Sequence, residues 1–518
     1  MPVYSNDYWN SDKWDPMDYG KDYDFSKPFF EQYLDLSNKV PRFNCAIINS
    51  IDCDYCSKIT NSKNCYLCIA YEAENDLYGN YSRITHNCVD YYFMTNSDWC
   101  YESIHCSKCT NVKWSLYSFE CRDSSFLFDC KNCSDCFGCA GLRNKKYCIY
   151  NKSYTKEEYF EKIKELDIGG YKFVESSKKR LKELAAVIPR RFMISRNSPR
   201  TTGNHLEGLS NCTSCFDAEA LGGSIVNCKY INVVARSIKD SYDVLQTGEG
   251  TEPCYFSVAT WGFRDLFSVS SSVSSELIYC DMCRGSSHLF GCIALRNKQY
   301  CILNKQYTKE EYEELVPRII KHMNDMPYVD KKGRVYRYGE FFPPELSPFA
   351  YNETIAQEYF PLTKDEAIKQ GYRWKDPEPR NYEITKTPDQ LPDHIKDVPD
   401  SITSEIIGCS HEGKCNEQCT TAFKIIKEEL QFYRRMNLPL PRLCPNCRHY
   451  QRLKQRNPLK LWHRKCQCAG PKSENGVYAN TIPHQHGTSH CPNEFETSYA
   501  PERKEIVYCE SCYNSEVV

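Results

Sequence analysis

The sequence lacks any hydrophobic run that could cross a membrane. No stretch of its 518 residues approaches the roughly 18 consecutive apolar residues of a membrane span. Its start, Met1-Pro-Val-Tyr-Ser-Asn-Asp, also lacks the basic and apolar segments of a secretion signal. These absences predict a cytoplasmic protein that has no membrane partner.

Sequence motifs of common enzymes are also missing. There is no P-loop, G-x-S-x-G, H-E-x-x-H or dinucleotide-binding motif, and the zinc deaminase signature is absent. Repeat folds can carry catalytic carboxylates, so a solenoid-type carbohydrate-active enzyme is a third possibility. However, the aspartates recur at the turn positions of a repeat, where backbone structure alone explains them. We therefore predict a protein that is not an enzyme.

The chain has little net charge, with a formal value of -2 at pH 7. The charge is nevertheless uneven, because residues 424–465 contain 12 Lys or Arg and only two acids, Glu428 and Glu429. Cysteine, in contrast, is abundant. The 33 cysteines are an odd number and accompany no secretion signal, which favours reduced thiols and metal sites over a disulfide framework.

One segment of the sequence occurs twice. Residues 137–159 return as residues 290–312 with 18 of 23 positions identical, at an offset of 153 residues. Each copy ends in a capping box, Thr155 with Glu158 and Thr308 with Glu311, which predicts the start of a helix. The chain therefore contains a duplicated module that closes with a helix.

Upstream of each copy the pattern repeats at short period. Between Asn44 and Asn151, a polar residue precedes a cysteine or aromatic cluster every 10 to 12 residues. Two such steps span 20 to 24 residues, near the length of one coil in a β-solenoid. Asn, Asp and Ser suit the turns because they tolerate a left-handed backbone. We predict two Cys-rich, parallel β-helix-like solenoid modules, residues 44–166 and 211–323, joined by a helical linker at 167–210.

The solenoid cysteines have two interpretations. Several pairs have the C-x-x-C spacing of a zinc knuckle, so a zinc or iron–sulfur array is possible. The duplication argues for packing instead, because Cys133 and Cys136 correspond to Ser286 and Leu289 in the second copy. Leucine cannot replace a thiolate ligand, but it can replace a small buried apolar side chain.

Two further segments carry many aromatic residues. Residues 1–43 are aromatic and acidic, and we expect their rings to pack onto a neighbouring domain. Residues 324–404 hold ten prolines in their first 77 positions, together with a third capping box at Thr363 and Glu366. We predict an extended arm along other domains.

The last 110 residues give the strongest metal signal. In residues 405–460, Cys415 and Cys419 precede Cys444 and Cys447 by about 25 residues, a spacing typical of a zinc ribbon. Cys409 is an alternative first ligand.

A second set of cysteines lies in residues 461–518. Phe495 follows Cys491 by four residues as Phe423 follows Cys419, which indicates the same knuckle built twice. The histidines His484, His486 and His490 can join this site or belong to an inserted loop. Four occupied positions predict two structural Zn²⁺ ions. The expected ligands of the second ion are Cys491, Cys509, Cys512 and Cys468, with Cys466 as the alternative to Cys468.

Residues 415–454 resemble the probable zinc-ribbon domain of bacterial proteins. The shared features are Phe423, the Glu429-x-x-Phe432-Tyr433 segment and the final Cys444-x-x-Cys447-Arg448. The x3 spacing of Cys415 and Cys419 departs from the usual x2. The whole chain is similar to an uncharacterised group of large Cys-rich bacterial proteins with the same F-G-C-x-x-L-R-N-K ending. This resemblance implies an architecture but no reaction.

The basic stretch between the ribbons has two interpretations. Phosphate neutralisation with stacking on nearby Tyr and Trp rings predicts binding of RNA or single-stranded nucleic acid. Alternatively, the arginines pack against an acidic solenoid and the protein is a scaffold for protein partners. The sequence leaves the oligomeric state open. The candidate nucleic-acid contacts are Arg434, Arg435, Arg448, Arg452, Lys454 and Arg456.

Overall fold

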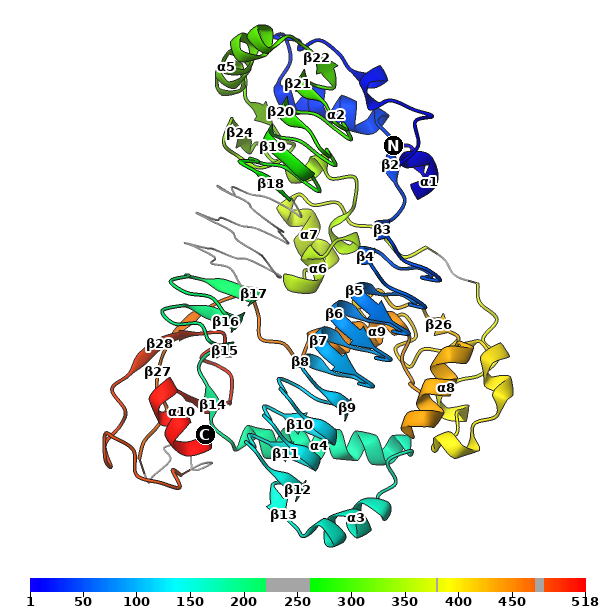
Figure 1. Cartoon of the computed structure of the whole chain (residues 1–518), viewed down its shortest axis with the longest axis vertical. Helices are drawn as coiled ribbons and strands as arrows, with labels where there is room; N and C mark the ends of the chain where they lie inside the picture. The colour runs from blue at the N-terminus through cyan, green and yellow to red at the C-terminus, as the bar shows by residue number, and fades with distance from the viewer. Residues whose placement is uncertain (220–260, 379–380, 471–478) are drawn as a thin grey trace.

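The protein is described from a computed structural model, which covers residues 1–219, 261–378, 381–470 and 479–518. The fold is mainly β, with two solenoid modules and cysteine clusters near the C-terminus, as the sequence predicts (Figure 1). The predicted repeat positions at Cys228, Asp240 and Cys254 lie outside the described residues.

One coil of the solenoid takes 12 residues, half of the predicted 20 to 24. Ile47 pairs with Ile59, and Arg122 pairs in parallel with Ser134 on the next coil. The reason is that the chain turns at every third residue. The corner residues Asn49, Asp52 and Tyr55 have φ values of 47°, 51° and 54°, and the same spacing continues through most of the module. Four left-handed corners per coil close it after a single step.

The lumen of such a narrow coil admits mainly small side chains. Inward positions follow the corners by one residue, so they also recur every third residue. Cys88, Cys100 and Cys130 at these positions are buried. The Cys130 thiol donates to the carbonyls of Phe128 and Cys139, each at 3.5 Å, and the other lumen cysteines repeat this pattern. Cysteine therefore fills the lumen as a small, weakly polar side chain.

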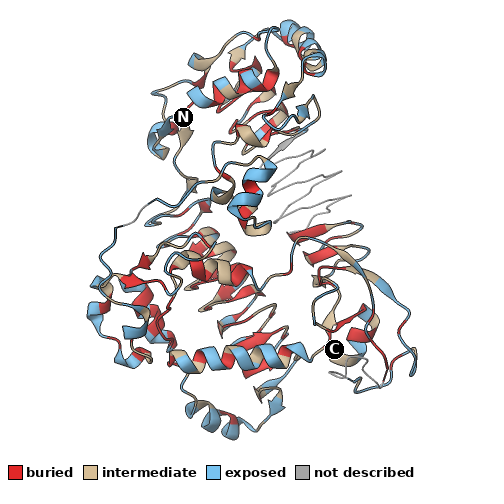
Figure 2. Ribbon diagram, turned by 180° about the vertical axis from the view of Figure 1, so that it is seen from behind, coloured by how far each residue is buried: buried red, intermediate tan, exposed pale blue. Residues whose placement is uncertain are grey.

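Module 1 ends as the duplicated segment predicts. Both halves of the capping box are present at Thr155 and Glu158, and the helix α3 begins directly after Thr155. Helix α4 then runs back along β10 and β11, with its outer face exposed (Figure 2). The elements are β3 (Ile47–Ile48), β4 (Ile59–Thr60), β5 (Ile69–Glu74), β6 (Asn80–His86), β7 (Tyr92–Asp98), β8 (Ile104–Ser107), β9 (Thr110–Lys113), β10 (Arg122–Phe128), β11 (Ser134–Ala140), β12 (Lys146–Ile149), β13 (Lys152–Ser153), α3 (Lys156–Lys164) and α4 (Tyr171–Ala186).

Module 2 repeats this plan, and the N-terminal segment packs onto it rather than onto module 1, which follows it in sequence. Phe29 stacks edge-on against Phe290, and Phe30 against Tyr279, with ring centroids 5.2 and 5.3 Å apart. The elements are β15 (Ser195–Arg196), β16 (Gly203–Glu207), β17 (Cys215–Glu219), β18 (Trp261–Phe263), β19 (Ser272–Ile278), β20 (Ser287–Phe290), β21 (Gln299–Ile302), β22 (Lys305–Gln306) and α5 (Lys309–Asp325), with β1 (Val3–Tyr4), α1 (Asn6–Trp9), a 3-10 turn (Pro16–Tyr19), α2 (Phe29–Lys39) and β2 (Arg42–Phe43) from the N-terminus.

Residues 324–404 contact both modules. Phe342 packs against Tyr279 of module 2, with centroids 5.6 Å apart, and the Tyr359 hydroxyl lies 2.7 Å from that of Tyr92 in module 1. The third capping box, Thr363 with Glu366, is present. The elements are β23 (Tyr328–Val329), β24 (Val335–Tyr336), α6 (Ala356–Tyr359) and α7 (Lys364–Gln370), with 3-10 turns at Pro344–Leu346, Tyr351–Glu353, Pro388–Gln390, Ile395–Asp397 and Asp400–Ser404.

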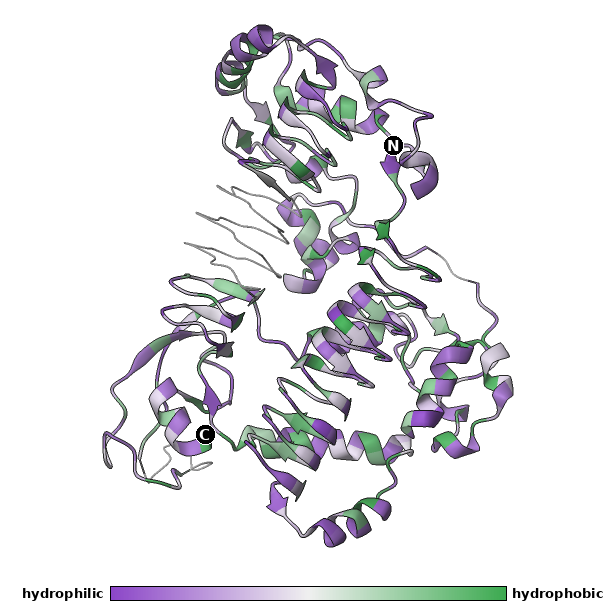
Figure 3. Cartoon of the chain, viewed as in Figure 1, coloured by the Kyte–Doolittle hydropathy of each residue, from purple (hydrophilic) through white to green (hydrophobic). Residues whose placement is uncertain are grey.

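The helices are short and of mixed polarity. Figure 3 shows hydrophilic and hydrophobic residues interspersed along them. Within the part of the chain that the structure describes, none combines the length and apolar composition that a membrane crossing requires.

Candidate metal centres and their docking surfaces

The first ribbon is a short hairpin followed by two helices. Strand β25 (Ile407–Gly408) pairs antiparallel with β26 (Ala422–Phe423). Helix α8 (Lys427–Met436) follows, and α9 (Pro445–Leu453) begins at its N-cap, Cys444. The strands place Cys409 at the end of the hairpin and Cys419 just before its return strand. The C-x-x-C pair lies in the first turn of α9, so two thiols come from the hairpin and two from the helix.

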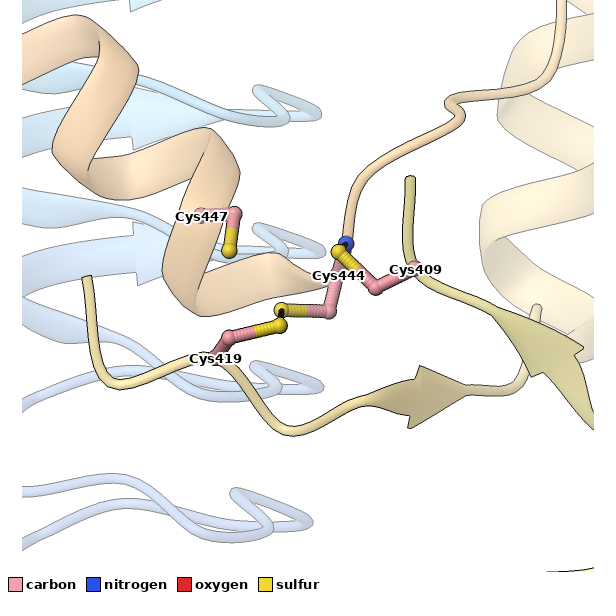
Figure 4. Close-up of side chains that lie close together, drawn as sticks. All are labelled: Cys409, Cys419, Cys444 and Cys447. Carbon is pink, nitrogen blue, oxygen red and sulfur yellow. Dashed lines mark hydrogen bonds between the residues drawn. The ribbon is translucent and has the colours of Figure 1, made fainter. Parts of the chain in front are cut away.

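These four thiols converge on one point. Cys409, Cys419, Cys444 and Cys447 place their sulfur atoms within 4.8 Å of one another (Figure 4). The Cys419 and Cys444 sulfurs are 4.0 Å apart. A tetrahedral zinc with Zn–S bonds of about 2.3 Å would hold its sulfurs about 3.8 Å apart. The group therefore has the composition and size of a tetrahedral thiolate site.

The surroundings of this group favour thiolate over thiol. Hydrogen bonds from Cys409 and then Cys447 lower the pKa of Cys444 far below its usual range. The Thr420 amide points at the Cys444 sulfur from 3.5 Å, and the Cys444 amide at the Cys409 sulfur from 3.3 Å. Donors directed at sulfur stabilise its negative charge, which a bound cation would also do.

The second ribbon repeats the frame of the first. Strand β27 (Trp462–Lys465) pairs antiparallel with β28 (Glu494–Thr497), β29 (Val507–Tyr508) follows, and α10 (Glu510–Val517) begins at its N-cap, Cys509. Cys466 follows the first strand as Cys409 does in ribbon 1. Its amide donates to the Asn493 carbonyl at 2.9 Å, as the Cys409 amide donates to the Thr421 carbonyl at 2.8 Å.

The thiols of the second ribbon also form a four-membered group. Cys466, Cys491, Cys509 and Cys512 have their sulfur atoms within 4.8 Å of one another, and all four are buried. The Cys491 and Cys509 sulfurs are 3.8 Å apart. A hydrogen bond from Cys466 lowers the pKa of Cys509 to about 4. Both ribbons can thus hold a metal ion with four cysteines.

The structure places the predicted ligands as follows. Cys419, Cys444, Cys447, Cys491, Cys509 and Cys512 lie in the two four-thiol groups, and the alternatives Cys409 and Cys466 complete them. Cys415 lies instead with His411, Glu417 and Cys447, its sulfur 3.7 Å from that of Cys447. Cys468 lies with His484, His486 and Cys512. The equivalence of Cys409-x-His411 and Cys466-x-Cys468 is the sequence signal for this arrangement.

The solenoid cysteines lie apart from these groups. Among the described residues, none of the side-chain clusters able to hold a metal ion contains a solenoid cysteine. Cys133 and Cys136 are buried, and so are their counterparts Ser286 and Leu289 in module 2. This burial agrees with the interpretation of these cysteines as packing residues.

The six predicted cations are divided between buried and exposed positions. Arg448 and Arg452 are only 4% and 3% exposed. Arg456 is half-buried, with its guanidinium over the rings of Tyr92 and Tyr359. The exposed cations are paired within the chain: Arg434 with Asp400 at 2.5 Å, Arg435 over the Trp99 ring at 3.6 Å, and Lys454 with Glu417. These six residues do not form one exposed basic surface.

Arg448 joins ribbon 1 to the solenoid. Its Nη1 donates to Asp90 Oδ2 at 2.6 Å, to Glu429 Oε1 at 3.2 Å and to the Tyr433 hydroxyl at 2.8 Å. Arg452 donates to the other oxygen of Asp90 at 2.8 Å. Asp90 is a left-handed corner of module 1 and is fully buried. Two arginines thus neutralise two buried acids, one from each side of the interface.

Around this network, helix α8 packs on a ladder of solenoid rings. Phe432 lies parallel to Trp99 with centroids 6.0 Å apart, and Tyr433 packs edge-on against Tyr101 at 5.7 Å. Between this helix and the asparagines Asn64, Asn75 and Asn87 lies a groove of about 640 Å³.

Ribbon 2 docks on module 1 through a different residue. Tyr513, which follows Cys512 as Arg448 follows Cys447, donates to Asp129 Oδ2 at 2.6 Å. Arg143 of the solenoid pairs with the same aspartate at 2.8 Å and donates to the Tyr513 hydroxyl at 2.5 Å. Strand β29 also pairs in parallel with β14 (Arg190–Arg191) of the linker.

One cluster has no counterpart in the sequence analysis. His105 of module 1 stacks on His205 of module 2 with centroids 3.8 Å apart, and His205 Nδ1 lies 2.9 Å from Asp217 Oδ1. Burial opposes ionisation of Asp217, but the His205 hydrogen bond and the nearby cations hold its pKa at about 2. A cavity of about 530 Å³ adjoins the histidines. The residues lie about 100 positions apart in sequence, so no local motif marks them.

Comparisons with known proteins identify no family. No protein-family model matches the sequence, and no curated protein matches it. A solved structure described as a "putative acetyltransferase from Desulfovibrio desulfuricans G20" has 11% sequence identity and a TM-score of 0.09, covering 57% of this chain and 83% of that chain. Similarity at this level carries no argument about the fold or the function.

Proposed function

We propose that this chain is a non-enzymatic, zinc-stabilised scaffold for protein partners, in which both ribbons clamp module 1. The observation that carries the proposal is the burial of Arg448 and Arg452 against Asp90 and Glu429. The cations that a nucleic-acid surface would need to expose are used to dock the ribbon. The groove between α8 and the asparagine ladder is the surface at which we expect an extended partner segment to lie.

Zinc is the proposed ion because four thiolates in tetrahedral array are its usual structural site. Four cysteines in each group would leave no coordination position for a substrate or an activated water. Each ion would therefore stabilise its ribbon rather than catalyse a reaction. The cysteines that the structure describes are all unpaired, which supports the proposed cytoplasmic location.

Nucleic-acid binding is the competing function, and one titration separates the two. A fluorescein-labelled 20-nucleotide single-stranded RNA would be titrated with the full chain at 50 and 200 mM salt. We expect no salt-dependent binding in the micromolar range. Binding that weakens with salt and is lost in an Arg434→Gln, Arg435→Gln variant with unchanged zinc content would support the nucleic-acid function instead. The resemblance to the zinc-ribbon group stays a prediction.

A further inference from the structure

The second ribbon contains more metal ligands than one ion can use. Besides its four thiols, Cys468, His484 and His486 lie with Cys512 in a second group whose ligand atoms are within 4.8 Å of one another. Cys512 is the only residue common to both groups. One zinc takes four ligands, whereas two tetrahedra that share one corner take seven, which is the number of side chains here.

The geometry of the second group suits a metal ion. The Cys468 sulfur lies 3.0 Å from His484 Nδ1 and 3.3 Å from His486 Nε2, and the latter atom is also 3.3 Å from the Cys512 sulfur. In a tetrahedral zinc site a sulfur and a nitrogen ligand would be about 3.5 Å apart. Cys468 and Cys512 are fully buried, and His484 is 6% exposed.

Both imidazoles are oriented as metal ligands are. His484 Nε2 lies 2.8 Å from the Glu516 carboxylate, and His486 Nδ1 lies 2.8 Å from the Ser489 carbonyl. Each acceptor requires the proton on the ring nitrogen that faces away from the thiols. The nitrogen that faces them then carries a free lone pair, which is the arrangement of a histidine that binds a metal.

We infer that ribbon 2 holds a binuclear zinc cluster in which the Cys512 thiolate bridges two ions. One ion takes Cys466, Cys491 and Cys509 as its other ligands, and the second takes Cys468, His484 and His486. Five thiolates with two divalent ions leave a net charge of about -1. The Asn480 and Asn493 side-chain amides, which donate to the Cys468 and Cys509 sulfurs at 2.9 and 3.3 Å, offset that charge.

Ribbon 1 offers a contrast within the same chain. At the corresponding place, His411, Cys415 and Glu417 lie beside Cys447. Glu417, however, already accepts hydrogen bonds from the Lys454 ammonium and from the Gln451 amide at 3.0 Å. A lysine thus occupies the position of the second ion. The full chain should therefore hold three zinc ions.

The inference rests on the proposed zinc binding by the four thiols, and the experiment separates the two. Zinc per chain would be measured by plasma mass spectrometry in wild type, in a His484→Ala, His486→Ala variant, and in His463→Ala as a matched control. His463 is an exposed histidine of the same ribbon, paired with Glu494 and Glu496. We expect the double variant to lose one zinc and the control to lose none. An unchanged zinc count in the double variant would overturn the inference.

Wild-type protein loaded with ¹¹³Cd gives a test that needs no variant. Two cadmium ions joined through one sulfur split each other's resonances, so we expect three resonances, of which two show this coupling. Two uncoupled resonances would mean that only the four-thiol sites bind metal and that Cys468 and His484 merely share an S–H···N hydrogen bond. A ribbon 2 without any metal would overturn the proposed function as well.

Discussion

The two ribbons share one frame and dock on one solenoid, yet they use different chemistry to do so. In each, the residue after the last cysteine contacts a left-handed corner aspartate of module 1: Arg448 contacts Asp90, and Tyr513 contacts Asp129. Ribbon 1 supplies the cation itself, whereas at ribbon 2 the solenoid supplies it as Arg143. The comparison teaches that the basic residues of ribbon 1 serve docking, because ribbon 2 docks at an equivalent corner without them.

Loss of a cysteine should have the largest effect and should differ between the ribbons. Cys447→Ser removes one ligand of one ion, whereas Cys512→Ser removes the bridge between two. We expect zinc losses of one and two ions per chain, measured by plasma mass spectrometry. Structural zinc contributes about 10–16 kcal/mol of apparent binding free energy, so the affected ribbon should also unfold. Equal losses in the two variants would contradict the comparison.

Breaking the charged dock of ribbon 1 should have the next largest effect. Arg448→Met leaves Glu429 buried beside one cation fewer, which should cost about 3–5 kcal/mol in unfolding free energy. Arg434→Met is the matched control, because its ion pair with Asp400 is exposed and should be worth about 0–1 kcal/mol. Urea unfolding followed by tryptophan fluorescence can report both. Similar costs for the two variants would mean that the buried network does not hold the ribbon.

A third aspartate of module 1 separates lumen from corner. Asp76 lies in the lumen and accepts hydrogen bonds from Thr85, Tyr91 and the Cys88 amide. Burial outweighs these donors and raises its pKa to about 6. Since this value exceeds that of the unfolded chain, the stabilising contribution is present below about pH 4 and is lost as the pH rises through 6.

The pH dependence of an Asp76→Asn variant tests this assignment. Relative to wild type, its unfolding free energy should rise by about 3 kcal/mol between pH 4 and pH 7, because the amide does not ionise. Asp90→Asn removes a carboxylate held between two arginines, so it should not show that gain. Urea titrations at each pH provide the measurement, and parallel curves for wild type and Asp76→Asn would rule the account of Asp76 out.

The smallest expected effect belongs to the dock of ribbon 2. Tyr513→Phe removes one hydrogen bond to Asp129, while Arg143 continues to pair with that carboxylate. We expect a cost of about 1 kcal/mol and unchanged zinc content. Amide hydrogen exchange across β14 and β29 can measure it. A cost as large as that of Arg448→Met would remove the difference between the two docks.

Much of the fold could be predicted from the sequence because its signals are local. The solenoid follows from the short repeat, and three capping boxes mark helix starts at Thr155, Thr308 and Thr363. The coil length was wrong because the sequence shows a step but not how many steps close a coil. Corners occupied by Tyr55 or Trp99 do not signal a left-handed backbone, although both adopt it.

The metal groups could be predicted only in part. C-x-x-C spacing identifies Cys444 and Cys447 because both ligands lie in one helix turn. Cys409 is ten residues from Cys419, and only the pairing of β25 with β26 brings the two together. The burial of Arg448 depends on Asp90, 358 positions away, which no local pattern can reveal. The same holds for His105 and His205.

The central claim is that metal belongs to the ribbons while the solenoid cysteines fill the lumen. The most direct test is zinc and iron per chain, on protein purified without added metal, together with a thiol count after denaturation in chelator. The account predicts three zinc ions, no iron and all 33 cysteines as free thiols. Iron, or five or more metal ions per chain, would contradict it, because the solenoid cysteines would then be ligands.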